Sequence, residues 1–232
     1  MPKVPSRRLP SVRQLIEVMA ILRSPEGCPW DREQDHATLK YHAVEEVYEL
    51  MDAIDARDDH EMGEELGDLL LQVVFHCQLG RERKAFDFDS VCQRLVDKLI
   101  RRHPHVFGDT QVRDVDEVWA NWDKIKRAEK VGTRHERPSA LDGIPKKLPA
   151  LMRAEKLVKK ARKAGLAPKT VSHQVRSKSA VARELFDLVA LAQARGWSAE
   201  SLLRTESQAR ERSWRRQEHT GEAASAAKAK RS

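Results

Sequence analysis

The chain has 232 residues and a net charge of +7 at pH 7, with 5% aromatic and 34% charged residues. This length allows one large domain or two small ones with a real core, and the composition favours helices over a β-sandwich or barrel, so we expect an all-α protein. No apolar run approaches the roughly twenty residues of a membrane span, and no signal peptide opens the chain. We therefore expect no membrane partner.

Charge and cysteine content narrow the function further. Residues 1–130 carry a net charge of −6 and residues 131–232 a net charge of +13. This asymmetry predicts two functional regions rather than one uniformly basic nucleic-acid binder, and we do not expect a nucleic-acid partner. The three cysteines are an odd number without paired spacing, which is typical of a reducing compartment and indicates a cytoplasmic protein.

Apolar residues recur at helical spacing along most of the chain. The predicted helices cover about 11–23, 35–56, 60–79, 90–102, 115–130, 151–164, 179–195 and 198–218. Two of them are expected to bury apolar stripes, namely Leu39, Ala43, Val47, Leu50 and Ile54, and Leu66, Leu69, Leu70, Val73 and Cys77. We expect a domain at 1–131, a Gly- and Pro-containing linker at 132–149, a second helical region at 150–220 and a disordered tail at 221–232.

Acidic residues gather on the second and third predicted helices. Between Glu45 and Asp68 there are eleven Asp or Glu residues and a single Arg. Acids spaced three or four apart share a helical face, where each like-charge pair costs roughly 0.2–0.5 kcal/mol. If the two helices pack antiparallel, four carboxylates meet at one seam: those of Glu46, Glu49, Glu65 and Asp68. Hard ions such as Mg²⁺ select carboxylate oxygens, so we predict a divalent metal site there.

Two other interpretations of the acids are weaker. A charged solvent face is the simplest, but basic partners are scarce and the acids border the apolar stripes. A di-iron bundle would need Glu-x-x-His on two helices, and only Glu33 and His36 have that spacing.

The acidic motif at 65–69 recurs as Glu-Leu-Phe-Asp-Leu at 184–188. This echo indicates a degenerate repeat in the second half. Residues 165–182, where a partner helix would lie, contain no acid. The second half alone therefore cannot assemble a two-helix carboxylate site.

The acidic pattern resembles the signature of the MazG family of nucleoside triphosphate pyrophosphohydrolases. Three neighbouring motifs resemble the same family, namely Gly-Cys-Pro-Trp-Asp at 27–31, Arg-Arg-His-Pro-His-Val-Phe at 101–107 and Ile-Pro-x-x-Leu-Pro-Ala-Leu at 144–151. The resemblance covers roughly residues 10–165. It implies an all-α bundle that forms a homodimer, binds Mg²⁺ with Mn²⁺ as a substitute, and splits nucleoside or deoxynucleoside triphosphates into monophosphate and pyrophosphate.

The resemblance also implies roles for single residues. The positions that match metal ligands are Glu46, Glu49, Glu65 and Asp68. From the chemistry of triphosphate cleavage we add Glu45 to these catalytic carboxylates, as a general base or an outer-shell ligand. The matching substrate-binding residues are Trp30, Lys98, Arg102, Trp122 and Lys126, with Trp30 expected to stack on the base. An alternative function is a catalytically vestigial helical protein whose basic C-terminal half recruits nucleic acid or a protein partner.

Overall fold

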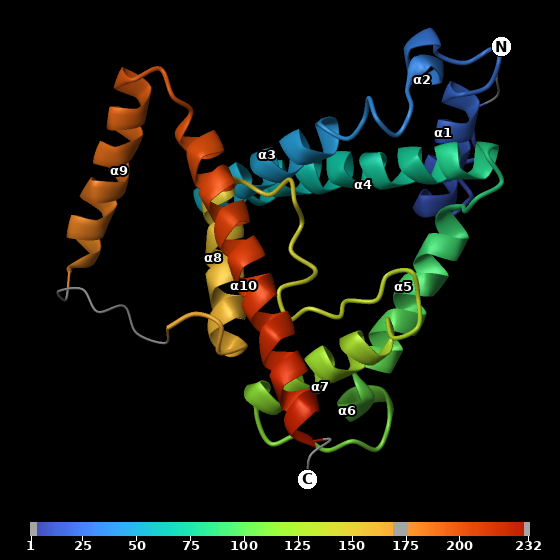
Figure 1. Cartoon of the computed structure of the whole chain (residues 1–232). Coiled ribbons are helices and arrows are strands. Elements are labelled where there is room, and N and C mark those ends of the chain that lie inside the picture. Colours follow the sequence, from blue (N-terminus) through green and yellow to red (C-terminus); the bar gives the residue numbers. More distant parts are fainter. Residues whose placement is uncertain (1–3, 169–175, 230–232) are drawn as a thin grey trace. The chain divides into compact units, whose positions relative to one another are not determined.

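The computed structural model describes residues 4–168 and 176–229, with side chains described as far as Thr220. All regular secondary structure in these residues is helical, which confirms the predicted all-α class (Figure 1). The chain divides into two compact units, Met1–Trp122 and Asp123–Ser232. Their boundary lies within a helix, upstream of the domain end predicted at residue 131.

The helices follow the predicted order closely. The first unit contains α1 (Ser11–Leu22), α2 (Pro29–Glu33), α3 (His42–Ala56), α4 (Asp59–Glu82), α5 (Phe88–Arg102), α6 (Pro104–Phe107) and the start of α7 (Val115–Ala128). The second unit contains the end of α7, followed by α8 (Ala150–Lys163), α9 (Lys178–Ala194) and α10 (Ala199–Ala229). The short helices α2 and α6 were not predicted.

One predicted helix begins later than expected. Helix α3 starts at His42 and not near Asp35. The Asp35 carboxylate accepts hydrogen bonds from the backbone N–H groups of Ala37 (2.6 Å) and Thr38 (2.9 Å). Such local side-chain bonds compete with the helical ladder and hold this segment in a turn.

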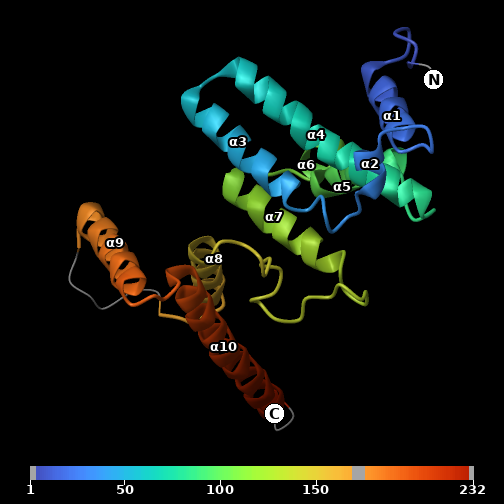
Figure 2. The same cartoon turned by 90° about the horizontal axis from the view of Figure 1, so that it is seen from above.

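A two-residue turn folds α3 back onto α4. Arg57 ends α3 in the left-handed conformation (φ 57°, ψ 38°) and its N–H reaches the carbonyls of Ala53 and Ile54. The Asp58 side chain then caps α4 by accepting hydrogen bonds from the backbone N–H groups of His60 and Glu61. The two helices run side by side as an antiparallel hairpin (Figures 1 and 2). This hairpin sets the two acidic motifs opposite each other.

The core of the first unit lies where α1 packs on the C-terminal part of α4. Its buried side chains are Met19, Leu39, Val74, Phe75 and Leu79, with Leu15, Ile16, Leu71 and Phe88 packed around them. Arg23 fixes the same junction through two 2.7 Å hydrogen bonds to the Glu82 carboxylate. The core therefore anchors one end of the α3–α4 hairpin and leaves the acidic end outside it.

A short hydrogen-bond chain ties the segment before α3 to α4. Arg83 Nη2 lies 2.8 Å from His36 Nε2, and His36 Nδ1 lies 2.7 Å from His76 Nδ1. A guanidinium can only donate, so His36 Nε2 accepts and the His36 proton sits on Nδ1, where it is donated to His76. Both imidazoles are therefore neutral in this arrangement.

The expectation that α3 and α4 bury their apolar stripes was wrong at several positions. Within the described first unit, five of these side chains remain between 39% and 55% exposed, namely Val47, Ile54, Leu66, Leu70 and Val73. A hairpin of two helices can cover each helix from one side only, so apolar residues on the outer flank stay uncovered. Cys77, in contrast, is buried as predicted.

In the second unit α8 packs along α10. Leu141, Leu157 and Ala161 form its buried core, and Trp214 of α10 packs against them. The segment predicted as a linker thus contributes Leu141 to a core. Helix α10 is helical through Ala229 and so includes most of the segment expected to be disordered.

Polar contacts hold the loop before α8 in place. Lys160 Nζ donates to the carbonyl oxygens of Ala140 (3.1 Å) and Asp142 (2.7 Å). Arg215 of α10 forms an ion pair with Asp142 at 2.8 Å and another with Glu211. The loop is therefore an ordered part of the second unit.

Helix α9 contrasts with α8, because most of its side chains are exposed, including Phe186 and Leu188. The acidic echo lies on this helix, with Glu184 and Asp187 both exposed. No group of three metal-ligating side chains forms in the second unit over its described residues. That this unit derives from a degenerate repeat stays a prediction.

Candidate metal centre

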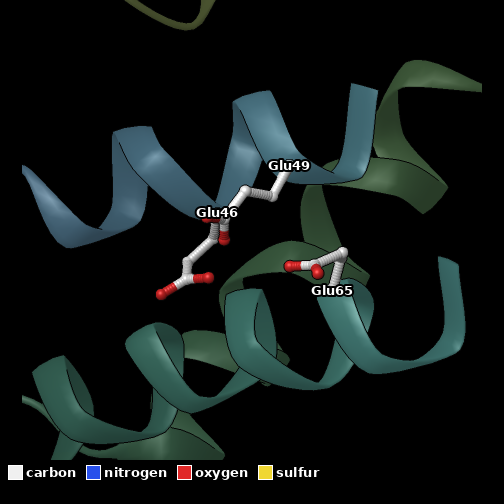
Figure 3. Close-up of side chains that lie close together, drawn as sticks. All are labelled: Glu46, Glu49 and Glu65. Carbon is white, nitrogen blue, oxygen red and sulfur yellow. The ribbon is translucent and has the colours of Figure 1, made fainter. Parts of the chain in front are cut away.

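Three of the predicted carboxylates converge between α3 and α4. Glu46 and Glu49, three residues apart, project from α3 toward Glu65 on α4 (Figure 3). One carboxylate oxygen from each lies within 4.8 Å of the others. Glu46 and Glu65 are half-buried, whereas Glu49 is exposed. The cluster therefore lies between α3 and α4 at the surface of the hairpin, and Glu49 is its solvent-exposed member.

The protein environment disfavours negative charge at this seam. Burial raises the pKa of Glu46, and the neighbouring charges of Asp68, Glu49, Glu65 and Glu45 raise this pKa further. Burial likewise raises the pKa of Glu65, followed by the charges of Glu49 and Asp68. Within the described residues, Glu65 Oε2 is buried and has no hydrogen-bond partner. A cation at this point would relieve both penalties.

The spacing of the oxygens suits a small divalent ion. Mg²⁺ binds oxygens at about 2.0–2.1 Å and Ca²⁺ at about 2.3–2.6 Å, so two ligands on opposite sides of an ion lie about 4–5 Å apart. The three carboxylates already fall within 4.8 Å. Only hard oxygen donors are present in the cluster, which favours Mg²⁺ or Mn²⁺ over softer metals. The residues therefore fit the predicted ion.

The other two predicted acids lie at the edge of this cluster. Asp68 is exposed on α4, close enough for its charge to raise the pKa of both Glu46 and Glu65, but it is outside the converging trio. Glu45 is exposed and faces His42, whose Nδ1 lies 3.8 Å from a Glu45 carboxylate oxygen. Their metal-binding and catalytic roles stay predictions.

The predicted substrate-binding residues come from three helices, α2, α5 and α7. Arg102 and Trp122 lie together, with the guanidinium carbon 5.1 Å from the centre of the indole ring. Lys98 is half-buried one turn before Arg102 on α5. Lys126 belongs to the second unit and Trp30 to the short helix α2. Trp122 and Lys126 lie four residues apart on α7.

Two aromatic residues near these sites were missed in the sequence. Trp119 is 60% exposed and meets Trp122 edge to face, with ring centres 5.7 Å apart. His42 contacts Trp30 in a similar way. A spacing of three or four residues from a predicted site residue on the same helix could have identified both, since Trp119 precedes Trp122 by three positions and His42 precedes Glu46 by four.

The fold and the cluster define an all-α protein with an acidic helical hairpin, and comparisons with known proteins assign its family. Residues 34–107 match the MazG nucleotide pyrophosphohydrolase domain, a range that contains the whole hairpin. An uncharacterised 26.1 kDa protein of Streptomyces cacaoi is 41% identical over 198 residues, which cover 84% of this chain and 78% of that protein. The chain belongs to the MazG family.

Two relatives carry an activity in their names. The nucleoside triphosphate pyrophosphohydrolase of Escherichia coli K12 is 47% identical over 155 residues, which cover 66% of this chain and 58% of that protein. The nucleoside triphosphate pyrophosphohydrolase/pyrophosphatase MazG of Thermotoga maritima is 46% identical over 152 residues, which cover 66% of this chain and 57% of that protein. The chain thus spans less than two thirds of these relatives. Among the helices described, none combines the length and apolar character needed to cross a membrane.

Proposed function

We propose that this chain is an Mg²⁺-dependent enzyme that hydrolyses nucleoside or deoxynucleoside triphosphates to the monophosphate and pyrophosphate. The observation that carries the proposal is the convergence of Glu46, Glu49 and Glu65 within 4.8 Å. The unpartnered, buried Glu65 Oε2 and the raised pKa of Glu46 support a cation there. The names of the relatives from Escherichia coli and Thermotoga maritima support the same reaction.

The chemistry needs charge neutralisation and a well-placed water more than covalent help. When bound to the trio, Mg²⁺ supplies positive charge to the phosphate oxygens and makes a coordinated water more acidic. Asp68 extends the ligand set at the edge of the trio. Glu45, on α3, acts either as the general base for the attacking water or as an outer-shell ligand.

Basic and aromatic side chains would hold the rest of the nucleotide. Lys98 and Arg102 share one face of α5, spaced four apart, and screen the charge of the leaving pyrophosphate. Stacking on Trp122 at 5.1 Å restrains the Arg102 guanidinium. Trp30 offers a surface for the base, and Lys126 is a further contact to the nucleotide.

The proposed assembly is a homodimer. The apolar flanks of α3 and α4 are uncovered. Helix α5 also carries half-exposed apolar side chains, namely Leu95, Val96, Leu99 and Ile100. Faces of this kind are usually covered by a partner, and a second copy is the simplest one. The free cysteines Cys28, Cys77 and Cys92 favour a cytoplasmic location, and we propose no membrane or nucleic-acid partner.

Pyrophosphate release from a panel of canonical and damaged nucleoside triphosphates tests the proposal. Wild type should release pyrophosphate from at least one of them with Mg²⁺, less readily with Mn²⁺, and not after chelation. Glu49→Gln should lose most of this activity because it removes a charged ligand. Asp55→Asn, an exposed acid on the same helix, should retain it. If wild type releases no pyrophosphate from any nucleotide, the enzymatic proposal fails and the vestigial binding protein becomes the better account.

A further inference from the structure

An exposed aromatic pair lies beside the carboxylate helix. Trp30 of α2 and His42, the first residue of α3, meet at an interplanar angle of 67° with their ring centres 6.3 Å apart. Trp30 is 54% exposed. Because the rings meet edge to face, His42 leaves at least one broad face of the indole uncovered. An uncovered indole face can stack on a flat ligand such as a nucleobase.

Helical register places this pair next to the metal centre. His42, Glu46 and Glu49 follow one another at spacings of four and three residues, so they share one face of α3. One helical turn is about 5.4 Å, so the aromatic pair begins one turn from the carboxylates. A ribose can bridge this separation when the triphosphate lies at the carboxylates.

The His42 ring also lies near an acidic side chain. Its Nδ1 lies 3.8 Å from Glu45 Oε2, one turn along the same helix. His42 thus lies near both a carboxylate of the acidic motif and the indole of Trp30. Its ring connects α2, which has only five residues, to the start of α3.

We propose that His42 is a positioning residue that holds Trp30 edge-on, so that the free face of the indole stacks on the nucleobase of the triphosphate. This inference rests on the proposed function for the identity of the ligand. In this arrangement Trp30, held by His42, contacts the base, whereas the carboxylates and their cation bind the phosphates. Stacking on an indole tolerates every base, since each has a π-face, so the pair favours nucleotides over base-free phosphates without selecting one base.

Equilibrium binding separates base contact from phosphate contact. The probes are an α,β-methylene nucleoside triphosphate, which cannot be cleaved between those phosphates, and inorganic tripolyphosphate, which has no base. Both are titrated by calorimetry with Mg²⁺ into the full chain. His42→Ala should weaken nucleotide binding about tenfold, the scale of a lost stacking contact, and should change the tripolyphosphate Kd by less than about twofold.

Three further variants sharpen the test. His42→Phe keeps an aromatic ring against the indole and should restore nucleotide binding to within about threefold of wild type. Trp30→Ala should weaken nucleotide binding as His42→Ala does, and the double variant should be no weaker than Trp30→Ala, because the two residues act as one unit. His60→Ala is the matched control, since His60 faces Glu61 on α4 at a similar 3.7 Å, and it should leave both Kd values unchanged.

An unchanged nucleotide Kd in His42→Ala would overturn the inference. So would equal weakening of both ligands, because His42 would then act on the phosphates, and so would failure of wild type to bind the nucleotide more tightly than tripolyphosphate. Pyrophosphate release from cleavable nucleotides is measured on the same preparations. If wild type binds the nucleotide through the pair but cleaves none, the inference stands and the proposed function fails.

Discussion

Replacing Glu46 by Gln should have opposite effects on stability with and without metal. Burial and four neighbouring acids raise the pKa of Glu46 above its ordinary value, so the charge on this carboxylate costs more free energy in the folded chain than in the unfolded one. Without metal, Glu46→Gln removes this charge and should stabilise the fold slightly. Each relieved like-charge pair at helical spacing, such as Glu46 with Glu49, is worth about 0.2–0.5 kcal/mol.

With Mg²⁺, wild type should instead be more stable than Glu46→Gln. An ion that binds only the folded chain stabilises it by about 2.7 kcal/mol at 100 times its Kd. For a chain of this size each kcal/mol corresponds to a Tm change of about 2–4 °C, so wild type should gain roughly 5–10 °C. Because Glu46→Gln removes one charged carboxylate of the trio, Mg²⁺ should raise the Tm of this variant by only a small part of the wild-type gain.

Thermal unfolding followed by circular dichroism, with EDTA or with Mg²⁺, measures both effects. Asp55→Asn controls for the loss of an exposed acid elsewhere on α3 and should gain as much from Mg²⁺ as wild type does. The reasoning is refuted if Glu46→Gln is less stable than wild type in EDTA, or if Mg²⁺ raises the Tm of both proteins equally.

Three other predictions concern the core, the pH response and the assembly. Leu157 is 1% exposed in the core of the second unit, so Leu157→Ala should open a cavity there. The free energy of unfolding measured in urea should fall by about 2–5 kcal/mol, and a fall below about 1 kcal/mol would contradict that packing. Burial lowers the pKa of His76, and protonation of the adjacent His36 lowers it further. The contribution of His76 to stability should therefore be present above pH 6.5 and lost as the pH falls below that value. The urea midpoint should therefore drop less between pH 7.5 and 5.5 in His76→Gln than in wild type, and an equal drop would argue against the neutral imidazole pair. Leu66→Asp places a charge on the exposed flank of α4 and should convert the proposed homodimer to monomer in light scattering, whereas an unchanged mass would place the interface elsewhere.

The acidic hairpin was predictable because its information is local. The spacing of the acids predicted the convergence of Glu46, Glu49 and Glu65 on the condition that the two helices pack antiparallel, but it also placed Asp68 among them, and Asp68 lies outside the trio. The connection that brings them together is also encoded locally, in the cap that Asp58 provides for α4. Family membership was predictable for a related reason, since the motifs occur in order along one stretch of chain.

The covering of the helices was not predictable in the same way. Apolar periodicity reports which side of a helix is apolar, but it does not report whether this chain or another surface covers that side. Val47 and Leu66 lie on such stripes and remain half-exposed, whereas Leu39 is buried although it precedes α3. Burial of Leu141 in the expected linker depends on α8 and α10, far along the chain. These outcomes are set by tertiary contacts that no local pattern contains.

Contacts among the predicted substrate-binding residues also depend on tertiary structure. Arg102 and Trp122 come from different helices, and their contact could not be read from spacing. The aromatic partners His42 and Trp119 carried a weaker signal, because a lone aromatic near a motif is more often structural. Only the ring contacts in the folded chain show that each lies against a predicted site residue.

The central claim is that the carboxylate trio enables cleavage between the α- and β-phosphates of a nucleotide. The most direct measurement is ³¹P NMR of the products formed from one accepted triphosphate with Mg²⁺, by wild type and by Glu49→Gln. Wild type should produce monophosphate and pyrophosphate in equal amounts, and a folded Glu49→Gln should produce almost none. Formation of diphosphate and orthophosphate, or equal turnover by the two proteins, would contradict the account.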